Sequence, residues 1–264
     1  MQATRAATTQ WSERLVRARF LAGSQPWAGE VLRLYTAIAA VQERAFEAAL
    51  SSPPEAARLA EHVAAGVMPE IVAATVANGP ATLAGAVLAR FNEARLESII
   101  EAWLTGAEQP ATETFLARAS TSPLLEADPA LAGAWRLEGE AANRCPVCAG
   151  LPQLSWFGVS GEALVTGPRY LACSRCTCAW VYPRLVCAGC GEEDSKKLSV
   201  LADAERFPGV RVDACDSCRR YLLTVDMPKD PDAVPLVDEL AALPLDLHAK
   251  ELGLKKVTPN LMGF

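Results

Sequence analysis

Apolar side chains recur every three or four residues through the first half of the chain. Between Trp27 and Leu50 they form one face of an amphipathic helix, made of Val31, Leu34, Tyr35, Ile38, Val41 and Ala45. A similar pattern from Thr82 to Thr105 predicts a second long helix. Proline and glycine predict helix breaks at Ser51–Pro54, Gly66, Asn78-Gly79-Pro80, Gln109-Pro110 and Ser122-Pro123. Residues 1–140 should therefore form an all-helical bundle of five to seven helices.

The pattern changes near Asn143. Short runs rich in β-branched and aromatic residues replace the helical period, and they predict strands at Arg169–Ala172, Ala179–Tyr182, Lys197–Leu201 and Tyr221–Val225. A helical pattern then runs from Val234 to about Leu254, and Pro244 should break it near its middle. The tail after Thr258 is expected to be irregular.

Composition narrows the class of protein. Half of the 264 residues are hydrophobic, which is enough for a substantial core, and the net charge is -6. No apolar run reaches the length of about 18 residues that a membrane span needs, so stable membrane insertion is not expected. The segment Met1–Phe20 lacks the apolar core of a secretory signal, and a soluble cytoplasmic protein is the expectation.

The nine cysteines are the main chemical feature, and all of them lie between Cys145 and Cys218. In a reducing compartment such clustering favours metal ligands over disulfides. Eight of the nine form four Cys-x-x-Cys pairs, which are Cys145/Cys148, Cys173/Cys176, Cys187/Cys190 and Cys215/Cys218. The second four follow the first four at a constant offset of 42 residues, and Gly-x-Arg-x-x-Ala-Cys at Gly167 recurs at Gly209. This spacing indicates an internal duplication of one ribbon unit.

Two Cys-x-x-Cys turns facing each other supply a tetrahedral thiolate site, which selects zinc or iron. We predict two metal ions, with site 1 at Cys145, Cys148, Cys173 and Cys176 and site 2 at Cys187, Cys190, Cys215 and Cys218. Gly191 lies where such a turn needs a positive φ. A crossed arrangement, in which Cys173/Cys176 share a metal with Cys187/Cys190, is the alternative pairing. Cys178 is left over, either as a half-buried strand residue or as a reactive thiol.

The flanking residues are more specific than the cysteines. The blocks are Cys145-Pro-Val-Cys148, Arg169-Tyr-Leu-Ala-Cys173-Ser-Arg-Cys176-Thr-Cys-Ala-Trp180, Arg184-Leu-Val-Cys187-Ala-Gly-Cys190, Cys215-Asp-Ser-Cys218-Arg-Arg-Tyr221, Ala233-Val-Pro-Leu-Val-Asp238, Leu245-Asp246-Leu and Pro259-Asn260-Leu-Met-Gly263. From about residue 143 to the end, the sequence resembles the formate dehydrogenase accessory protein family of the FdhE type. The helical first half matches only in general character.

The resemblance implies a cytoplasmic assembly chaperone that binds the catalytic subunit of formate dehydrogenase and is not itself an enzyme. It also implies rubredoxin-like iron at the cysteine sites, with zinc as the other candidate. The expected fold class is α+β, with a helical bundle followed by two tandem rubredoxin-like or zinc-ribbon modules and a C-terminal helix. The predicted domains are residues 1–140, 141–184, 185–228 and 229–264.

Two other functions are compatible with cysteine ribbons. A nucleic-acid-binding zinc ribbon would need a basic surface, but residues 140–225 hold 10 Lys and Arg against 9 Asp and Glu. Each loaded site would add about -2, so no nucleic-acid partner is expected. A thiol or sulfur-transfer factor would need a reactive thiol, with Cys178 as the candidate. No catalytic motif was found, which agrees with a protein that is not an enzyme.

Several residues have a structural and a functional interpretation. Arg169 and Arg211, at matching repeat positions, are expected to orient the ribbons, with solvated strand positions as the alternative. Trp180 is expected to pack between the ribbons, with a partner surface as the alternative. The histidines, His62 and His248, have no ligand at metal-binding spacing. Asp238 and Asp246 are expected to form a solvated polar face, with a carboxylate site as the alternative.

Overall fold

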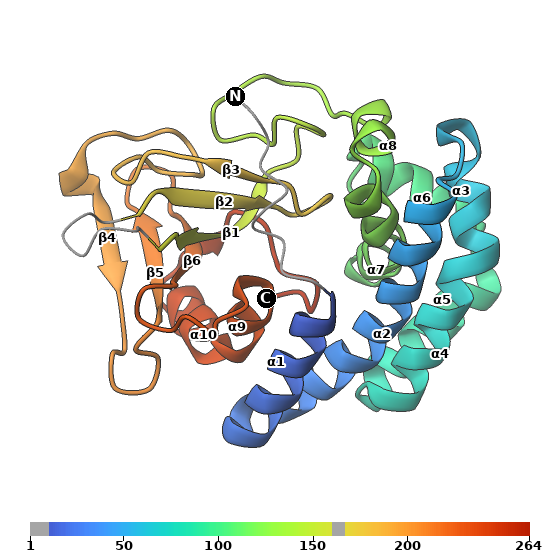
Figure 1. Ribbon diagram of the computed structural model, residues 1–264, viewed down its shortest axis with the longest axis horizontal. Helices are drawn as coiled ribbons and strands as arrows, with labels where there is room; N and C mark the ends of the chain where they lie inside the picture. The colour runs from blue at the N-terminus through green and yellow to red at the C-terminus, as the bar shows by residue number, and fades with distance from the viewer. Residues whose placement is uncertain (1–10, 160–166) are drawn as a thin grey trace.

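The computed structural model describes residues 11–159 and 167–264 of the chain. The sequence predicts no secretory signal in Met1–Phe20, and the first ten of these residues lie outside the described part of the chain. A bundle of helices forms one half of the molecule, and a sheet covered by two short C-terminal helices forms the other (Figure 1). This mixed architecture confirms the predicted α+β class, with a helical N-terminal region and two four-cysteine clusters in the C-terminal part.

The helical half is built from amphipathic helices; all but the first share the main hydrophobic core, and the first packs in a second cluster with residues 234–241. The helices are α1 (Trp11–Ser24), α2 (Gly29–Ser51), α3 (Leu59–His62), α4 (Met68–Asn78), α5 (Ala81–Glu93), α6 (Leu96–Thr105), α7 (Ala111–Ala127) and α8 (Pro129–Ala134). Short 3-10 turns at Pro26–Ala28 and Ala56–Arg58 precede α2 and α3, and a π turn at Val63–Val67 joins α3 to α4. The helix predicted from Trp27 corresponds to α2, whose buried face includes Leu34, Tyr35, Ile38 and Val41.

Three predicted helix boundaries were wrong. The pattern from Thr82 to Thr105 is divided between α5 and α6, because the backbone is extended at Ala94 and Arg95. The apolar pattern continues across this break because both helices pack against α7. Gly66 does not end a helix, because it lies inside the π turn of a continuous helical segment.

Pro123 also lies inside a helix, in the fourth turn of α7. A proline cannot donate to the carbonyl four residues earlier, which leaves the carbonyl of Ala119 without its usual partner. The buried side-chain amide of Gln42 donates to that carbonyl at 2.8 Å. A contact from α2 thus replaces the missing backbone hydrogen bond.

The sheet shows the duplication directly. Its strands are β1 (Pro152–Phe157), β2 (Arg169–Cys173), β3 (Ala179–Val181), β4 (Leu198–Leu201), β5 (Val210–Cys215), β6 (Arg220–Asp226) and β7 (Lys255–Lys256). Each repeat forms a three-stranded antiparallel meander, β1–β2–β3 or β4–β5–β6. The two meanders join through a parallel pairing of β1 with β6, which gives the order β3-β2-β1-β6-β5-β4, and β7 adds to β6. The two ribbon units therefore share one sheet.

The C-terminal helical pattern is broken near its middle, as predicted. It forms α9 (Pro235–Ala241) and α10 (Leu243–Glu251), and Pro244 lies in the first turn of α10. Helix α9 packs against α1 and the sheet, and α10 packs against β5. The helices thus cover the sheet on the side of α1 (Figure 1).

The expectation of a solvated face for Asp238 and Asp246 was wrong, because both side chains are buried. Asp238 pairs with Arg17 of α1 at 2.5 Å and accepts a hydrogen bond from the Val234 amide at 2.7 Å. Asp246 accepts from Lys256 at 3.0 Å and from the Tyr221 hydroxyl at 2.8 Å. Both carboxylates are thus structural.

Lys256 lies at the centre of a buried chain of polar groups. Its ammonium group contacts Glu239 at 2.6 Å and Asp246 at 3.0 Å, and all three side chains are 2 % exposed or less. Glu239 accepts in turn from Gln153, and Gln153 accepts from Arg118 of α7. This chain connects the C-terminal helices and the sheet to the helical bundle.

One continuous helical stretch, Ala56–Asn78, is long and apolar enough to cross a membrane by length and composition. Half of its most apolar window is buried inside the protein.

Replacing Lys256 with methionine should destabilise the fold by about 3–5 kcal/mol, because two buried carboxylates lose their cation. Burial already raises the pKa of Glu239, and Lys256 counteracts that shift. Without Lys256 the pKa rises further, so the folded state binds more protons than the unfolded state. The loss of stability should therefore be larger at pH 8 than at pH 5. Urea unfolding at the two pH values measures this, and an equal loss at both would contradict it.

Candidate metal centres

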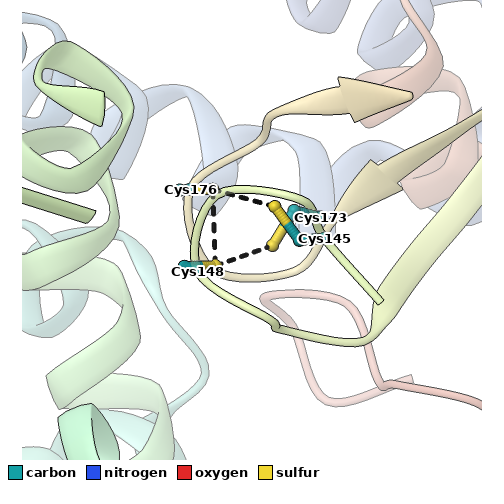
Figure 2. Close-up of side chains that lie close together, drawn as sticks. All are labelled: Cys145, Cys148, Cys173 and Cys176. Atoms are coloured by element: carbon teal, nitrogen blue, oxygen red, sulfur yellow. Dashed lines mark hydrogen bonds between the residues drawn. The ribbon is translucent and has the colours of Figure 1, made fainter. Parts of the chain in front are cut away.

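The first cluster brings together the cysteines of the first repeat. Cys145 and Cys148 come from the turn before β1, and Cys173 and Cys176 come from the end of β2 and the turn that follows it. All four sulfurs lie within 4.8 Å of one another and all four residues are buried. The Sγ–Sγ distances are 3.7 Å for Cys145–Cys176, 3.4 Å for Cys148–Cys173 and 3.5 Å for Cys148–Cys176 (Figure 2).

The second cluster repeats this arrangement with Cys187, Cys190, Cys215 and Cys218, whose sulfurs also lie within 4.8 Å of one another. The Sγ–Sγ distance is 3.8 Å both for Cys187–Cys218 and for Cys190–Cys215. Unlike the first cluster, this one reaches the surface, since Cys190 is exposed and Cys218 is half-buried. The structure thus groups the cysteines within each repeat and does not form the crossed alternative.

The backbone of the turns repeats with the same 42-residue offset. In the first turn, the amide of Cys145 donates to Gly150 and the amide of Ala149 donates to Cys145, each at 2.9 Å. In the second, Cys187 donates to Glu192 at 2.8 Å and Gly191 donates to Cys187 at 2.9 Å. The predicted positive φ at Gly191 is confirmed at 82°, and its counterpart Ala149 has a φ of 55°. A left-handed residue is thus built into each turn.

The sulfur distances fit a tetrahedral metal site. Metal–sulfur bonds of about 2.3 Å at tetrahedral angles place neighbouring sulfurs about 3.8 Å apart. A disulfide would require about 2.05 Å, far below any of the distances in the two clusters. Each cluster could therefore hold one ion, and eight cysteines could hold two. An all-sulfur set suits zinc and iron alike, so the geometry does not choose between them.

Four neighbouring thiols affect one another's ionisation. Hydrogen bonds from the other thiols, that of Cys148 foremost, lower the pKa of Cys145. Burial raises the pKa of Cys173 well above its ordinary value. Four free thiols cannot all ionise in this buried space, whereas a divalent cation would hold them all as thiolates.

Cys178 lies outside both clusters. It is half-buried next to β3, and its thiol faces the carbonyl of Ala179 at 3.8 Å. Its pKa is raised, first by contact with Cys145 and then by burial. These surroundings match the interpretation as a half-buried strand residue, because a reactive thiol needs a lowered pKa. His62 and His248 are exposed residues on α3 and α10, remote from the clusters in the fold.

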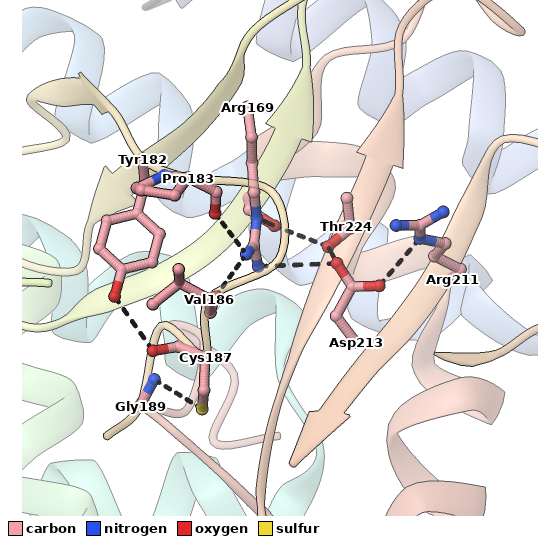
Figure 3. A network of polar contacts seen from close by, with 10 residues as sticks. Arg169, Tyr182, Pro183, Val186, Cys187, Gly189, Arg211, Asp213 and Thr224 are labelled. Carbon is pink, nitrogen blue, oxygen red and sulfur yellow. Dashed lines mark hydrogen bonds and ion pairs between the residues drawn. The ribbon is translucent and has the colours of Figure 1, made fainter. Parts of the chain in front are cut away.

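The two repeats are joined by a buried guanidinium group. Arg169 of β2 is 3 % exposed, and its Nη2 lies 3.6 Å from the carboxylate of Asp213 on β5. It also donates to the carbonyl of Val186 at 3.1 Å, directly before the turn of Cys187 (Figure 3). Burial lowers the pKa of Arg169, and Asp213 opposes that shift. Arg169 therefore orients the second repeat, as the repeat pattern predicts.

Its partners had not been recognised in the sequence. The Thr224 hydroxyl donates to Asp213 at 2.6 Å, and Arg211 donates to the other oxygen of Asp213 at 2.9 Å. Ser155 accepts from Arg169 at 3.3 Å (Figure 3 shows the network). These contacts depend on the parallel pairing of β1 with β6, and no short sequence pattern predicts that pairing. Trp180 is buried in the main core and donates to the carbonyl of Ala142 at 3.1 Å, which is a packing role.

The fold and the clusters define a class of protein, a helical bundle fused to a duplicated sheet with one four-cysteine cluster in each repeat. Comparisons with known proteins show which family the chain is similar to. Residues 185–262 match the family model described as FdhE, C-terminal domain. The crystal structure of the FdhE protein from Pseudomonas aeruginosa superposes with a TM-score of 0.69 at 28 % identity, over 98 % of this chain and 97 % of that chain.

Curated relatives agree with these matches. The chain is 34 % identical over 122 residues to an FdhE homologue of Aquifex aeolicus, covering 46 % of this chain and 42 % of the relative. It is 36 % identical over 132 residues to an FdhE homologue of Pseudomonas aeruginosa, covering 48 % of this chain and 41 % of the relative. The aligned region thus spans about two fifths of these relatives. The predicted resemblance to the FdhE family is confirmed.

Substituting one cysteine at a time should separate the two clusters. Cys148→Ser and Cys190→Ser should each lower the metal content from two ions per chain to one. The loss of stability should be greater for Cys148→Ser, because the first cluster is buried. The serine hydroxyl would remain there without a hydrogen-bond partner. Cys178→Ser is the matched control and should keep both ions. Elemental analysis together with thermal unfolding measures this, and an unchanged metal content in Cys148→Ser would contradict it.

Replacing Arg169 with methionine should cost about 1–3 kcal/mol of stability, because the carbonyl of Val186 loses its donor and Asp213 loses one of its two cations. It should also speed the loss of metal from the second cluster, since the turn of Cys187 loses the contact through Val186. Arg211→Met serves as control, because the Arg211 side chain is about one third exposed. Urea unfolding and the rate of metal transfer to a chelator test both effects. Equal behaviour of the two variants would argue against the role of Arg169.

Proposed function

We propose that this protein is a metal-binding accessory factor that acts as an assembly chaperone for formate dehydrogenase. In this proposal it works in the cytoplasm, binds the catalytic subunit of the enzyme and catalyses no reaction of its own. The observation that carries the proposal is the likeness to an FdhE crystal structure over nearly the whole chain, with both cysteine clusters formed. The residues that resemble the family support it independently.

Two metal ions would serve as structural clamps in this proposal. The ligands would be Cys145, Cys148, Cys173 and Cys176 at site 1 and Cys187, Cys190, Cys215 and Cys218 at site 2. Each ion would hold two turns of one repeat together, and Arg169 would hold the repeats in one orientation. The result would be a rigid surface for recognising a protein. Iron at these sites would add sensitivity to oxygen, most directly at site 2, where Cys190 is exposed.

The alternative functions have less support. A nucleic-acid ribbon lacks the necessary excess of basic residues, because site 2 is surrounded by acidic Glu192, Glu193 and Asp194 as well as by Lys196 and Lys197. A sulfur-transfer factor would use Cys178, but this thiol is half-buried and faces the carbonyl of Ala179.

Affinity capture from anaerobically grown cells of the native host tests the proposal. Tagged protein should recover the catalytic subunit of formate dehydrogenase, and it should carry two ions of iron or zinc per chain. The double variant Cys145→Ser/Cys148→Ser should recover much less of the subunit, and Cys178→Ser should recover as much as the wild type. Deletion of the gene should lower the formate dehydrogenase activity of the cells. Normal activity after deletion, with no subunit captured by the wild type, would refute the proposal.

A further inference from the structure

A cavity of about 590 Å³ lies between the helical bundle and the C-terminal tail. Its walls come from α2, α5, α6 and α7, from the turn that carries Arg175 and from residues 258–264 of the tail. The chain end marked C in Figure 1 lies between the sheet and the bundle. Exposed residues such as Glu30, Pro80 and Ala111 form the rim, whereas buried Phe115 and Arg175 lie inside. The volume is within the range of ligand sites, about 300–1,000 Å³.

The cavity collects buried polar atoms that have no partner among the described residues. Arg175 is 5 % exposed; its Nη2 donates to the carbonyl of Leu104 at 2.7 Å, but its Nε and Nη1 have no acceptor. Both side-chain atoms of the Gln109 amide and the hydroxyl of Thr258 are likewise buried without partners. Buried polar groups are normally paired, so unpaired ones on three lining residues indicate that a partner, water or a ligand, enters the cavity.

The charged side chains inside the cavity are basic. Arg118 and Arg175 both line it, each less than a tenth exposed, and the one acidic side chain among the described lining residues is Glu30 at the rim. Helices α5 and α7 begin at the cavity, after Pro80 and Pro110, and neither has a side-chain cap. Their free N–H groups and dipoles add positive potential at the same place. The cavity therefore favours an anionic group.

The walls are mostly apolar and include Leu34, Leu83, Trp103 and Phe115. An occupant must therefore combine a negative charge with apolar groups. The amide of Gln109 offers a donor and an acceptor side by side, which complements a peptide group. A phosphate or a fatty acid would leave the amide donor or the amide acceptor unpaired. A peptide satisfies both requirements.

We infer that this cavity binds a short extended segment of a partner protein in which an acidic side chain stands next to apolar residues. Arg175 would pair with the carboxylate, Gln109 with a peptide group of the segment, and the apolar wall with the neighbouring side chains. The inference concerns the recognition chemistry of the cavity, and it holds whether or not formate dehydrogenase is the partner.

Arg175 has a second role, beside the first cluster, that the test must distinguish from ligand binding in the cavity. The backbone amide of Arg175 donates to the sulfur of Cys173 at 3.4 Å, so the residue lies next to the first cluster. Its guanidinium charge would therefore also offset the negative charge of four thiolates bound to a metal ion there. If this were its main role, Arg175→Gln would release metal from that cluster and would leave peptide selection unchanged. Gln109 belongs to the loop before α7 and contributes to neither cluster. A variant at Gln109 therefore tests the cavity alone.

The test uses metal-loaded full-length protein and a positional-scanning library of fluorescent, amidated pentapeptides. Wild-type protein should select Asp or Glu at one position, by at least tenfold over Asn or Gln, and Leu, Phe or Met beside it. Arg175→Gln should abolish the acidic preference, and Gln109→Leu should weaken binding of all selected peptides at least tenfold. Arg206→Gln, a variant of an exposed arginine in the β4–β5 loop, is the matched control and should behave as the wild type.

Metal content and the thermal unfolding midpoint of each variant verify that it is folded. Binding should also slow hydrogen exchange at the start of α7 and in the C-terminal tail. The inference is overturned if the wild type shows no acidic preference. It is equally overturned if Arg175→Gln keeps that preference, if Gln109→Leu binds the selected peptides as tightly as the wild type, or if phenyl phosphate binds and the peptides do not.

Discussion

Each repeat of the sheet depends on four sulfur atoms that must stay within 4.8 Å of one another. The strands they connect are short, from three to seven residues in β1–β6, and such strands have little stability of their own. Free thiols would contribute only weak hydrogen bonds and could not all ionise in the buried first cluster. A tetrahedral ion would replace this weak cluster with four strong bonds and would fix both turns of the repeat at once. The geometry of the turns, including the left-handed residues Ala149 and Gly191, is built for that purpose.

The two clusters share this geometry but not their surroundings. The first is enclosed by the main core, which it joins through Cys145, Cys148, Cys173 and Cys176. The second cluster lies at the surface of the other repeat, where Cys190 is exposed. Two contacts connect the repeats: the parallel pairing of β1 with β6 and the ion pair of Arg169 with Asp213. They fix the orientation of one repeat relative to the other.

The sequence predicted the features that depend on local spacing. Cysteine pairs repeat at a constant offset, and helical periodicity marks residues that pack on one face, so both can be read without a structure. Features that depend on distant residues escaped. Gln42 supports the proline within α7, and Lys256 neutralises Asp246, but neither partner is close in sequence. Strands β1 and β5 were also missed. In β1, polar Gln153 and Ser155 alternate with apolar residues, yet all six residues are buried, because both polar side chains bond to distant buried partners.

The central claim is that each chain holds two metal ions in all-sulfur sites. X-ray absorption spectroscopy on protein purified anaerobically from its native host tests this claim most directly, when combined with a measured metal-to-protein ratio. The account predicts two ions per chain, each with a first shell of four sulfurs at about 2.3 Å. A first shell containing nitrogen or oxygen, or a ratio of one ion or fewer per chain, would contradict it.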